Sequence, residues 1–407
     1  MSSEQSHFAG EIAAPSPDTA MPFVVGFFFS FRLFIILLSV RALGTDPQTG
    51  TEISIALNLL LLFVVAFSTL GAADRTFGSM LYLPSIRWVL FFLAFTCCSL
   101  SWSVAASLSA AAAYWCAMAA DTAMIVLLLR IQPTTSLVHS LMKGYVCGAS
   151  AIAVIAWLLP TQSDLRLGDE ELLGANQIGY LCAFAFFFAQ YLIQQKIARY
   201  SIPAILLGVT LLRSLSKTTI VAFLVAEGFI LLRDRSMSRR TKLLLLFTTA
   251  LITLAFSSLL TSYFDIYSNA GNSPETLTGR LGIWAVILDE AIKQPWIGHG
   301  FYSVWKVIPP FGDFEARHAH NELIQLFYSY GAVGIAMMAG LYISFYLQIR
   351  RFTTGSLRTF YCALLIFVLI RGLADTEVFD LSLSLWAIVM FSLLMEQTHS
   401  SDLPLES

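Results

Sequence analysis

Charged residues are scarce in this sequence. Asp, Glu, Lys and Arg together make up 12% of its 407 residues, hydrophobic residues make up 57%, and the mean hydropathy is +0.73. Soluble domains carry roughly 25% charged residues. A chain with so few charges cannot cover a large water-exposed surface, so the composition predicts an integral membrane protein.

Other absences exclude several classes of function. The formal net charge is only -2, and no phosphate loop or dinucleotide fingerprint occurs, so we expect neither nucleic acid nor a nucleotide as a ligand. The six cysteines lie within or beside apolar stretches without CxxC spacing, which indicates small core residues rather than a zinc site. Residues 1–21 contain no Lys or Arg and so lack the basic start of a secretory signal. We interpret them as a flexible tail.

Long apolar segments dominate the rest of the chain. A spanning helix needs about 20 mostly apolar residues, and about twelve segments of this kind occur. They are residues 22–40, 54–71, 86–101, 109–130, 136–159, 177–195, 201–213, 218–232, 243–260, 322–348, 359–373 and 380–396. The sequence therefore predicts an all-α, polytopic membrane protein with about 12 transmembrane helices.

The basic residues between these segments predict the orientation. They gather near Lys196, in residues 233–242 and in residues 350–358, which the positive-inside rule places in the cytoplasm. Both termini then lie in the cytoplasm, and residues 160–176 and 261–320 face the exterior. We expect one membrane domain, residues 22–396, flanked by cytoplasmic tails at 1–21 and 397–407, with 261–320 as its large outer loop.

One pair of apolar segments is unusually short. Residues 201–232 are interrupted by Arg213 and Lys217, and both flanks carry the cytoplasmic signal, so the segment must form a hairpin. Each arm spans roughly 20 Å, less than the hydrocarbon core, and the turn should dip into the membrane. Two cations at that depth favour an anion-binding cavity open to the outside. The alternative is that both side chains snorkel to the headgroups.

The outer loop contains a further predicted helix. Leu281, Trp284, Ala285, Leu288 and Ile292 recur at helical spacing, which predicts an amphipathic helix along the membrane surface. Arg280 in its first turn places a cation where the helix dipole disfavours one, and a bound anion would explain it. A solvated surface arginine is the alternative.

Polar residues cluster where the outer loop meets the next apolar segment, in "RHAHNELIQLFYSYGAVG" at 317–334. A histidine at a water-facing helix mouth can accept a proton near neutral pH, and Asn321 or Glu322 could orient the His320 ring. The alternative is a histidine satisfied at the membrane interface. His299 and His318 suggest a metal, but no second carboxylate stands at recognisable ligand spacing, so we expect none.

A second, mixed cluster of charges follows near the end of the chain. Arg371, Asp375, Glu377 and Asp380 are expected on the outer side, where they could hold sugar hydroxyls or pair with one another.

Several of these segments together resemble the O-antigen ligase and polysaccharide polymerase family. The resemblance rests on "GRLGIW", "QPWIGHGFYSVW" and "HAHNELIQLFYSYGAVGI", on "SLSKT" after the short helix, and more loosely on "LSWS" at 100–103 and "GANQIGY" at 174–180. It extends from about residue 90 and is most specific in 278–334. Lys217 stands where ligases usually have Arg. Lys followed by Thr, and the short interval from Trp305 to His318, are similar to exopolysaccharide polymerases of the succinoglycan type.

The resemblance implies transfer of a glycan from an undecaprenyl-diphosphate carrier to an acceptor sugar, at the periplasmic face of the bacterial inner membrane, without a metal or nucleotide sugar. His320, Arg280 and Lys217 are then the expected catalytic residues. The residues expected to bind substrate are Arg213, Asn321, His318, Arg317 and Asn176. Proteins that regulate chain length are possible partners.

Three classes of function remain open from the sequence. The first is an inverting glycosyltransferase, either a polymerase or a ligase that transfers glycan to lipid A core. The second is a transporter or flippase of an anionic lipid-linked sugar, since many helices with buried cations also suit an anion carrier. The third is a structural subunit. Inverted repeats would favour a transporter, and the sequence shows none.

Overall fold

A computed structural model describes most of the chain. The described residues are 17–70, 82–160, 162, 165–169, 172–196, 200–233, 238–255, 257–258, 261–262, 277–308, 318–352, 355–376 and 378–401. Helices account for nearly all regular structure in them, and the β-type pairing is an isolated bridge between Asp169 and Leu173. The predicted all-α architecture is confirmed.

The helices follow one another closely along the chain. They are α1 (Pro17–Leu43), α2 (Pro47–Ser68), α4 (Pro84–Ser99), η1 (Leu100–Trp102), α5 (Leu108–Leu128), α6 (Thr134–Leu158), α7 (Ala175–Gln194), α8 (Ser201–Arg213), α9 (Lys217–Arg233), α10 (Arg239–Ala255), α12 (Leu277–Ala291), α13 (Val304–Val307), α14 (Glu322–Arg350), α15 (Ser356–Gly372) and α16 (Val378–Ser401).

Each of the apolar segments picked out in the sequence coincides with one of these helices. Seven helices in the described part of the chain, α1, α2, α4 with η1, α5, α6, α7 and α14, are long and apolar enough to cross a membrane. Helix α8 and the apolar part of α16 are shorter. The protein is therefore a polytopic membrane protein, while the expected number of twelve crossings stays a prediction.

Local sequence signals explain where helices begin. Asp46 caps α2, because its carboxylate accepts hydrogen bonds from the backbone N–H groups of Gln48 and Thr49, both at 3.0 Å. Ser107 caps α5 in the same way through Ala110. Proline opens α2 and α4 at the first helical position, where its missing N–H has no helical partner to lose.

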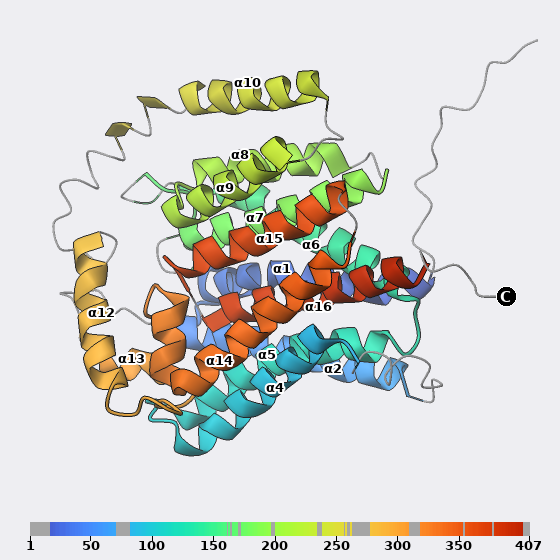
Figure 1. Ribbon diagram of the computed structural model, residues 1–407. Helices are drawn as coiled ribbons and strands as arrows, with labels where there is room; N and C mark the ends of the chain where they lie inside the picture. Colours follow the sequence, from blue (N-terminus) through green and yellow to red (C-terminus); the bar gives the residue numbers. More distant parts are fainter. Residues whose placement is uncertain are drawn as a thin grey trace, which may run out of the picture.

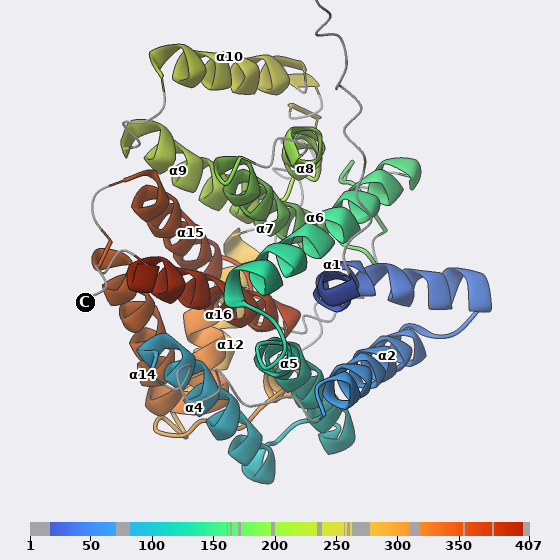
Figure 2. The same ribbon diagram turned by 90° about the vertical axis from the view of Figure 1, so that its right-hand side faces the viewer.

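The helices form a bundle with α16 at its centre. Figure 2 shows α16 between α5, α6, α14 and α15, with α1 and α2 on one side and α7, α8, α9 and α10 above. Trp386 of α16 is fully buried and stacks on Phe29 of α1, with ring centroids 4.5 Å apart. Such large aromatic contacts fix how the helices pack, since lipid tails provide little drive for apolar association.

Helix α12 differs from the others in direction. In Figure 1 the bundle helices run across the view, and α12 crosses their left-hand end nearly at a right angle, beside α13 and the start of α14. This is the direction expected of a helix that lies along a membrane surface. The bundle end covered by α12 is where the polar residues of the site lie.

Candidate functional site

His320 stands immediately before α14, at the end of the bundle that α12 covers. The N-cap is Asn321, whose side-chain oxygen accepts a hydrogen bond from the Ile324 N–H at 3.1 Å. The backbone of His320 has φ 50°, in the left-handed region that few non-glycine residues adopt. This conformation turns the His320 side chain back toward the α15–α16 connection, where it is 8% exposed. Conformations of this kind gather at functional sites.

The partner of His320 is Asp375, in the connection between α15 and α16. Nδ1 of His320 lies 3.2 Å from Oδ1 of Asp375, and the Asp375 side chain is fully buried. Burial alone would raise the pKa of this carboxyl, but the hydrogen bond from His320 and the charge of Arg371 outweigh it and hold the pKa well below its usual range. Asp375 is therefore ionised at neutral pH.

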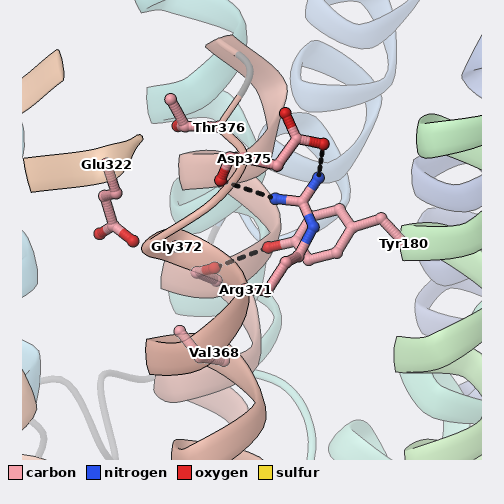
Figure 3. A pocket seen from close by; sticks show the side chains of 8 residues that line it. Tyr180, Glu322, Val368, Arg371, Gly372, Asp375 and Thr376 are labelled. Atoms are coloured by element: carbon pink, nitrogen blue, oxygen red, sulfur yellow. Dashed lines mark hydrogen bonds and ion pairs between the residues drawn. The ribbon is translucent and has the colours of Figure 1, made fainter. Parts of the chain in front are cut away.

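Arg371 supports the same carboxylate from the last turn of α15. Its Nη2 lies 3.5 Å from Oδ2 of Asp375, and its guanidinium carbon lies 3.5 Å from the centroid of the Tyr180 ring. The Tyr180 hydroxyl in turn lies 2.8 Å from the hydroxyl of Ser384. Figure 3 shows this stack beside a small pocket lined by Tyr180, Glu322, Val368, Arg371, Gly372, Asp375, Thr376 and Ser384. A cation held over an aromatic face is fixed in direction as well as in place.

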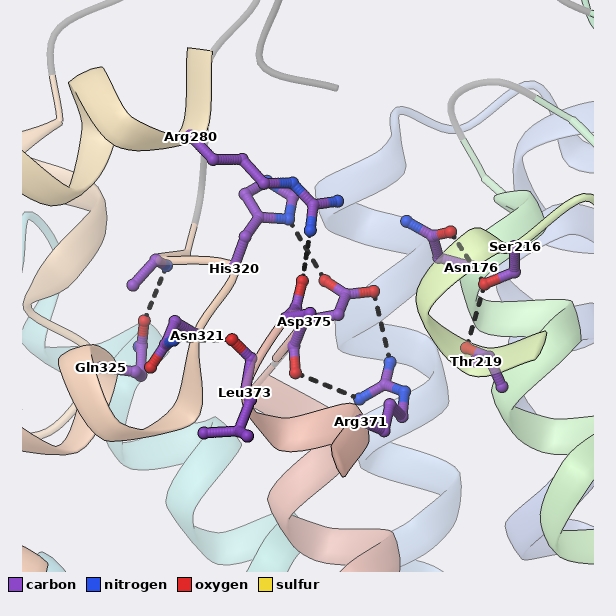
Figure 4. Close-up of polar contacts among 12 residues, drawn as sticks. Asn176, Ser216, Thr219, Arg280, His320, Asn321, Gln325, Arg371, Leu373 and Asp375 are labelled. Atoms are coloured by element: carbon purple, nitrogen blue, oxygen red, sulfur yellow. Dashed lines mark hydrogen bonds and ion pairs between the residues drawn. The ribbon is translucent and has the colours of Figure 1, made fainter. Parts of the chain in front are cut away.

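Arg280 reaches the same connection from α12. Its guanidinium donates a hydrogen bond to the carbonyl oxygen of Ala374, the neighbour of Asp375 (Figure 4). Trp284, one turn further along α12, donates through its indole N–H to the carbonyl of Ala319 at 2.8 Å. Helix α12 thus contacts the chain on both sides of the His320–Asp375 pair. The buried Nε of Arg280 has no hydrogen-bond partner among the described residues.

His318 lies against His320, with ring centroids 4.0 Å apart. Burial, with a smaller effect of the neighbouring His320, holds the pKa of His318 well below 6.5, so its imidazole is neutral at neutral pH. Nδ1 of His318 and Nε2 of His320 are both buried and have no hydrogen-bond partner within the described ranges. Two nitrogens able to bind a polar group therefore face the interior of the site.

His318 and His320, together with Asp375, form a group that could hold a metal ion. One ligand atom each from His318, His320 and Asp375 lies within 4.8 Å of the others. Two histidines and one carboxylate are a known zinc set. Here, however, Asp375 already receives His320 on one oxygen and Arg371 on the other, and a cation would have to displace both. The sequence placed Asp375 in a separate cluster of charges and did not connect it with His320, because 55 residues separate the two.

A second group of polar residues surrounds the turn between α8 and α9. The Ser216 hydroxyl donates to Oδ1 of Asn176 at 3.0 Å and lies 2.9 Å from the Thr219 hydroxyl (Figure 4, right). Lys217 is the first residue of α9, directly after Ser216. The start of α7 is packed tightly against this turn, since a Cβ added at Gly179 would lie 2.8 Å from the Ser216 Cβ. Two short helices of 13 and 17 residues are present where the hairpin was predicted, while a turn that dips into the membrane stays a prediction.

Helix α7 joins the two groups. Asn176 and Tyr180 are four residues apart and so lie on the same helical face. Asn176 contacts the turn that precedes Lys217. The Tyr180 ring lies under the guanidinium of Arg371, which pairs with Asp375. The "GANQIGY" segment is therefore the structural link between the lysine turn and the histidine pair.

Two of the candidate residues have partners that the sequence did not indicate. Arg213 and Lys217 lie on different helices, because α8 ends at Arg213 and Leu215 has φ 57°. Arg213 donates to the carbonyl of Leu165 at 2.9 Å. The ring of His320 is oriented by Asp375 rather than by Asn321 or Glu322.

Asn321 and Glu322 have other partners in the fold. The Asn321 amide donates to the Leu373 carbonyl at 2.6 Å, and Glu322 accepts from the Tyr342 hydroxyl at 2.7 Å. A substrate-binding role of Asn321 stays a prediction. Arg317 and Glu377 lie outside the described residues, as does the side chain of Asp380.

The packed face of α12 also differs from the predicted stripe. Ile283, Ile287 and Ala291 are fully buried, whereas Leu281, Leu288 and Ile292 are exposed. The helix has apolar residues on two faces, and spacing alone could not say which face meets the protein. The buried face is the one that continues from Arg280 through Trp284, which is why Arg280 points into the site.

Comparison with known proteins agrees with this architecture. Residues 202–339, from α8 into α14, match the model of the O-antigen ligase family. The chain is also 23% identical over 295 residues to the exopolysaccharide production protein ExoQ of Rhizobium meliloti (strain 1021). That similarity covers 66% of this chain and 66% of ExoQ, just under two thirds of the relative's length. Together with the helical membrane fold, these similarities support the resemblance to the O-antigen ligase family that the sequence motifs indicate.

Proposed function

We propose that the protein is a membrane glycosyltransferase that moves an undecaprenyl-diphosphate-linked glycan onto an acceptor sugar and so polymerises repeat units of an exopolysaccharide or O-antigen. The observation that carries this proposal is the His320–Asp375 pair. Nδ1 of His320 lies 3.2 Å from the buried Asp375 carboxylate, while Nε2 of His320 is buried and has no hydrogen-bond partner among the described residues. That arrangement suits a general base for a hydroxyl group.

The donor's diphosphate would be bound by cations. Arg280 lies in the first turn of α12 beside the Asp375 connection, and Lys217 opens α9, where the N–H groups of the first turn also favour an anion. As the bond between the anomeric carbon and the phosphate oxygen breaks, negative charge grows on the diphosphate. Fixed cations in a site shielded from water stabilise that charge without a metal ion.

The acceptor would be activated by His320. With Nδ1–H donated to Asp375, Nε2 is the nitrogen left to take the proton of the acceptor hydroxyl. The hydroxyl oxygen then attacks the anomeric carbon from the face opposite the diphosphate, which leaves with the bonding electron pair, and the configuration is inverted. Asp375 stabilises the imidazolium that forms. The products are the lengthened glycan and undecaprenyl diphosphate.

Further residues would hold the substrates in place. Asn176 and Arg213 belong to the segments around the lysine turn, and His318, Asn321 and Arg317 precede α14. Neutral His318 would contact a hydroxyl through a hydrogen bond and not through charge. In this proposal the site faces the periplasm from the inner membrane, both termini lie in the cytoplasm, and regulators of chain length can act as partners.

Ligation is the nearest alternative, since the matched family model is that of O-antigen ligases. Polymerisation is favoured because Lys217 followed by Thr218 resembles exopolysaccharide polymerases, and because the similar protein ExoQ is named for exopolysaccharide production. A transporter of lipid-linked sugar needs cations but no buried base with a carboxylate behind it.

The deciding experiment uses purified protein and a synthetic undecaprenyl-diphosphate oligosaccharide, alone and with an added core-lipid acceptor. Products are resolved by gel and mass spectrometry, with His320→Ala in parallel. We expect products that grow by whole repeat units without added acceptor. Transfer only to the core lipid would identify a ligase. Movement of intact substrate across a vesicle membrane, without new glycosidic bonds, would identify a transporter.

A further inference from the structure

The segment 295–303, which connects α12 to α13, is bonded into a break in α14. Helix α14 loses helical geometry at Gly331, where φ is 62° and ψ is -159°. An unbroken helix would bond the N–H of Ala332 to Tyr328 and that of Val333 to Ser329. Instead Ala332 donates to Pro295 at 2.8 Å and Val333 to Trp296 at 3.1 Å. The carbonyls of Pro295 and Trp296 thus accept the hydrogen bonds that the Tyr328 and Ser329 carbonyls would accept in an unbroken helix.

The exchange is reciprocal. The carbonyls that the break releases, those of Tyr328 and Ser329, accept hydrogen bonds from the N–H groups of His299 and Gly300 at 2.9 and 2.8 Å. The His299 ring also lies flat on the Tyr328 ring, with centroids 4.4 Å apart and planes inclined by 9°. Two bonds within a helix are thus replaced by four bonds between segments, and no buried backbone group of the exchange is left without a partner.

The same segment is bonded to the end of α4. Val104 donates to the His299 carbonyl at 3.0 Å, and the Phe301 N–H donates to the Ser99 hydroxyl at 3.1 Å. The Ser103 hydroxyl donates to the Phe301 carbonyl at 2.6 Å. We call residues 295–303, with their bonds to 99–104 and 328–333, the clasp. It unites three sequence segments, "LSWS", "QPWIGHGFYSVW" and "YSYGAVG", that supply none of the proposed catalytic groups.

Gly331 is the residue on which the clasp depends. Its φ and ψ fall in a region that essentially only glycine adopts. A Cβ at this position would lie 2.4 Å from the Trp296 carbonyl carbon and 2.7 Å from the Ile297 nitrogen. Any side chain at 331 therefore excludes both the break in the helix and the close approach of the connecting segment.

The clasp holds α12, which carries Arg280, against α14, which begins just after His320. Helix α12 ends at Ala291, and turns bonded from Lys293 to Glu290 and from Gly298 to Gln294 lead directly into the clasp. Near its start α12 is attached through side chains, with Trp284 bonded to Ala319 before α14 and Arg280 bonded to Ala374 in the connection between α15 and α16. Backbone bonds at the clasp are the firmer attachment.

We propose that the clasp is a positioning element, with Gly331 and His299 as its positioning residues, that sets where Arg280 stands relative to His320. This inference rests on the proposed function, since Arg280 is assigned to the donor and His320 to the acceptor. Loosening the clasp leaves each side able to bind its substrate but misaligns the reacting atoms. Misplacement by about 1 Å can reduce the rate roughly 100-fold.

The test compares Gly331→Ala with Gly228→Ala. Gly228 lies in α9, and a Cβ added there meets nothing within 4 Å. We expect Gly331→Ala to reduce kcat by roughly 100-fold while the KM for the donor changes by no more than about twofold, and Gly228→Ala to retain wild-type turnover. Equal kcat in Gly331→Ala and wild type would overturn the proposal.

A second pair of variants separates positioning from chemistry, and serves if Gly331→Ala does not fold. His299→Phe keeps a flat ring on Tyr328, whereas His299→Ala removes it. We expect turnover within about threefold of wild type for the former and a loss of about tenfold for the latter. If His299→Phe were as inactive as His320→Ala, the imidazole of His299 would belong to the chemistry and the positioning role would be wrong.

Hydrogen exchange followed by mass spectrometry provides a readout that does not depend on activity. The amides of residues 299, 300, 332 and 333 are bonded in the clasp and should exchange slowly in wild type. In Gly331→Ala the amides of 299 and 300 should exchange quickly, whereas those of 332 and 333 can bond again within the unbroken helix. Fast exchange at these amides in wild type would contradict the clasp itself. Slow exchange in a wild-type protein that transfers no glycan would instead reject the proposed function and leave the clasp intact.

Discussion

Nδ1 of His320 lies 3.2 Å from Oδ1 of Asp375, although 55 residues separate the two in the chain. The contact is possible because His320 adopts a left-handed backbone conformation just before α14, and because Asp375 is in the short connection that follows α15. Arg371 and Tyr180 then fix the carboxylate from behind. The orientation of the His320 ring thus depends on residues at the ends of α14 and α15 and on Tyr180 of α7.

Replacement of His320 by Ala should abolish glycan transfer. General-base catalysis contributes about 10²- to 10⁴-fold, so turnover should fall by at least about 100-fold while the protein still inserts and folds. The measurement is repeat-unit addition by purified protein. His139→Gln is the matched control and should retain turnover, because His139 of α6 contacts Tyr191, near the opposite end of α7 from Asn176 and Tyr180. Polymer of full length from the Ala variant would exclude His320 as the base.

Asp375→Asn should keep the shape of the site and still reduce turnover strongly. An amide cannot hold the Nδ1–H tautomer or stabilise the imidazolium, and the analogous change in a hydrolase triad costs about 10⁴-fold. Asp289→Asn, on the exposed side of α12, is the control. The variants are compared across a pH series. An Asn variant with an unchanged rate and pH profile would show that Asp375 does not act through His320.

Arg280→Lys tests whether the guanidinium or only its charge is needed. Lysine keeps the charge but has all its N–H groups on one nitrogen, so it cannot donate to the Ala374 carbonyl and also make the two-pronged contact with a phosphate that a guanidinium makes. We expect turnover to fall by about 10- to 100-fold, with a further fall in Arg280→Ala. Arg87→Lys at the start of α4 should have no effect. Equal activity of the Lys variant would limit Arg280 to a general electrostatic role.

His318 should make stability depend on pH. Its folded pKa is depressed by burial, so between that pKa and about 6.5 the unfolded chain binds a proton that the folded protein does not. Stability therefore rises with pH through this window and is lost on acidification, by up to about 1.4 kcal/mol per pH unit for one proton. Thermal unfolding in detergent between pH 5 and 7.5 measures it. His318→Gln should flatten the slope, and an identical slope would assign the dependence to other groups.

Treatment with a chelator should leave glycan transfer unchanged, since in the proposed mechanism Arg280 and Lys217 supply the positive charge that stabilises the leaving diphosphate. The test is needed because His318, His320 and Asp375 form a cluster that could hold a metal ion. Added zinc should inhibit by occupying His320, and the chelator should reverse the inhibition. Loss of activity on chelation, with recovery on adding zinc, would show that the cluster binds a catalytic metal.

The sequence by itself determined the membrane class, the helical segments and the two short helices α8 and α9. These follow from local quantities, namely the length of apolar segments and the spacing of charges, and a bilayer offers backbone groups few arrangements other than a helix. His320, Arg280 and Lys217 were picked out because each interrupts an apolar context or occupies a helix end, and the family resemblance then assigned their roles.

Only the tertiary structure decided which of these residues meet. Asp375 and Arg371 were candidates in a separate cluster, and nothing in their spacing connects them to His320, because contacts across 55 residues depend on helix packing. The same holds for α12, whose two apolar faces are alike in sequence. It holds also for the break of α14 at Gly331, because the groups that bond into it belong to residues 295–300, which are distant in the chain. Local pattern specifies helices, whereas the site arises where their ends converge.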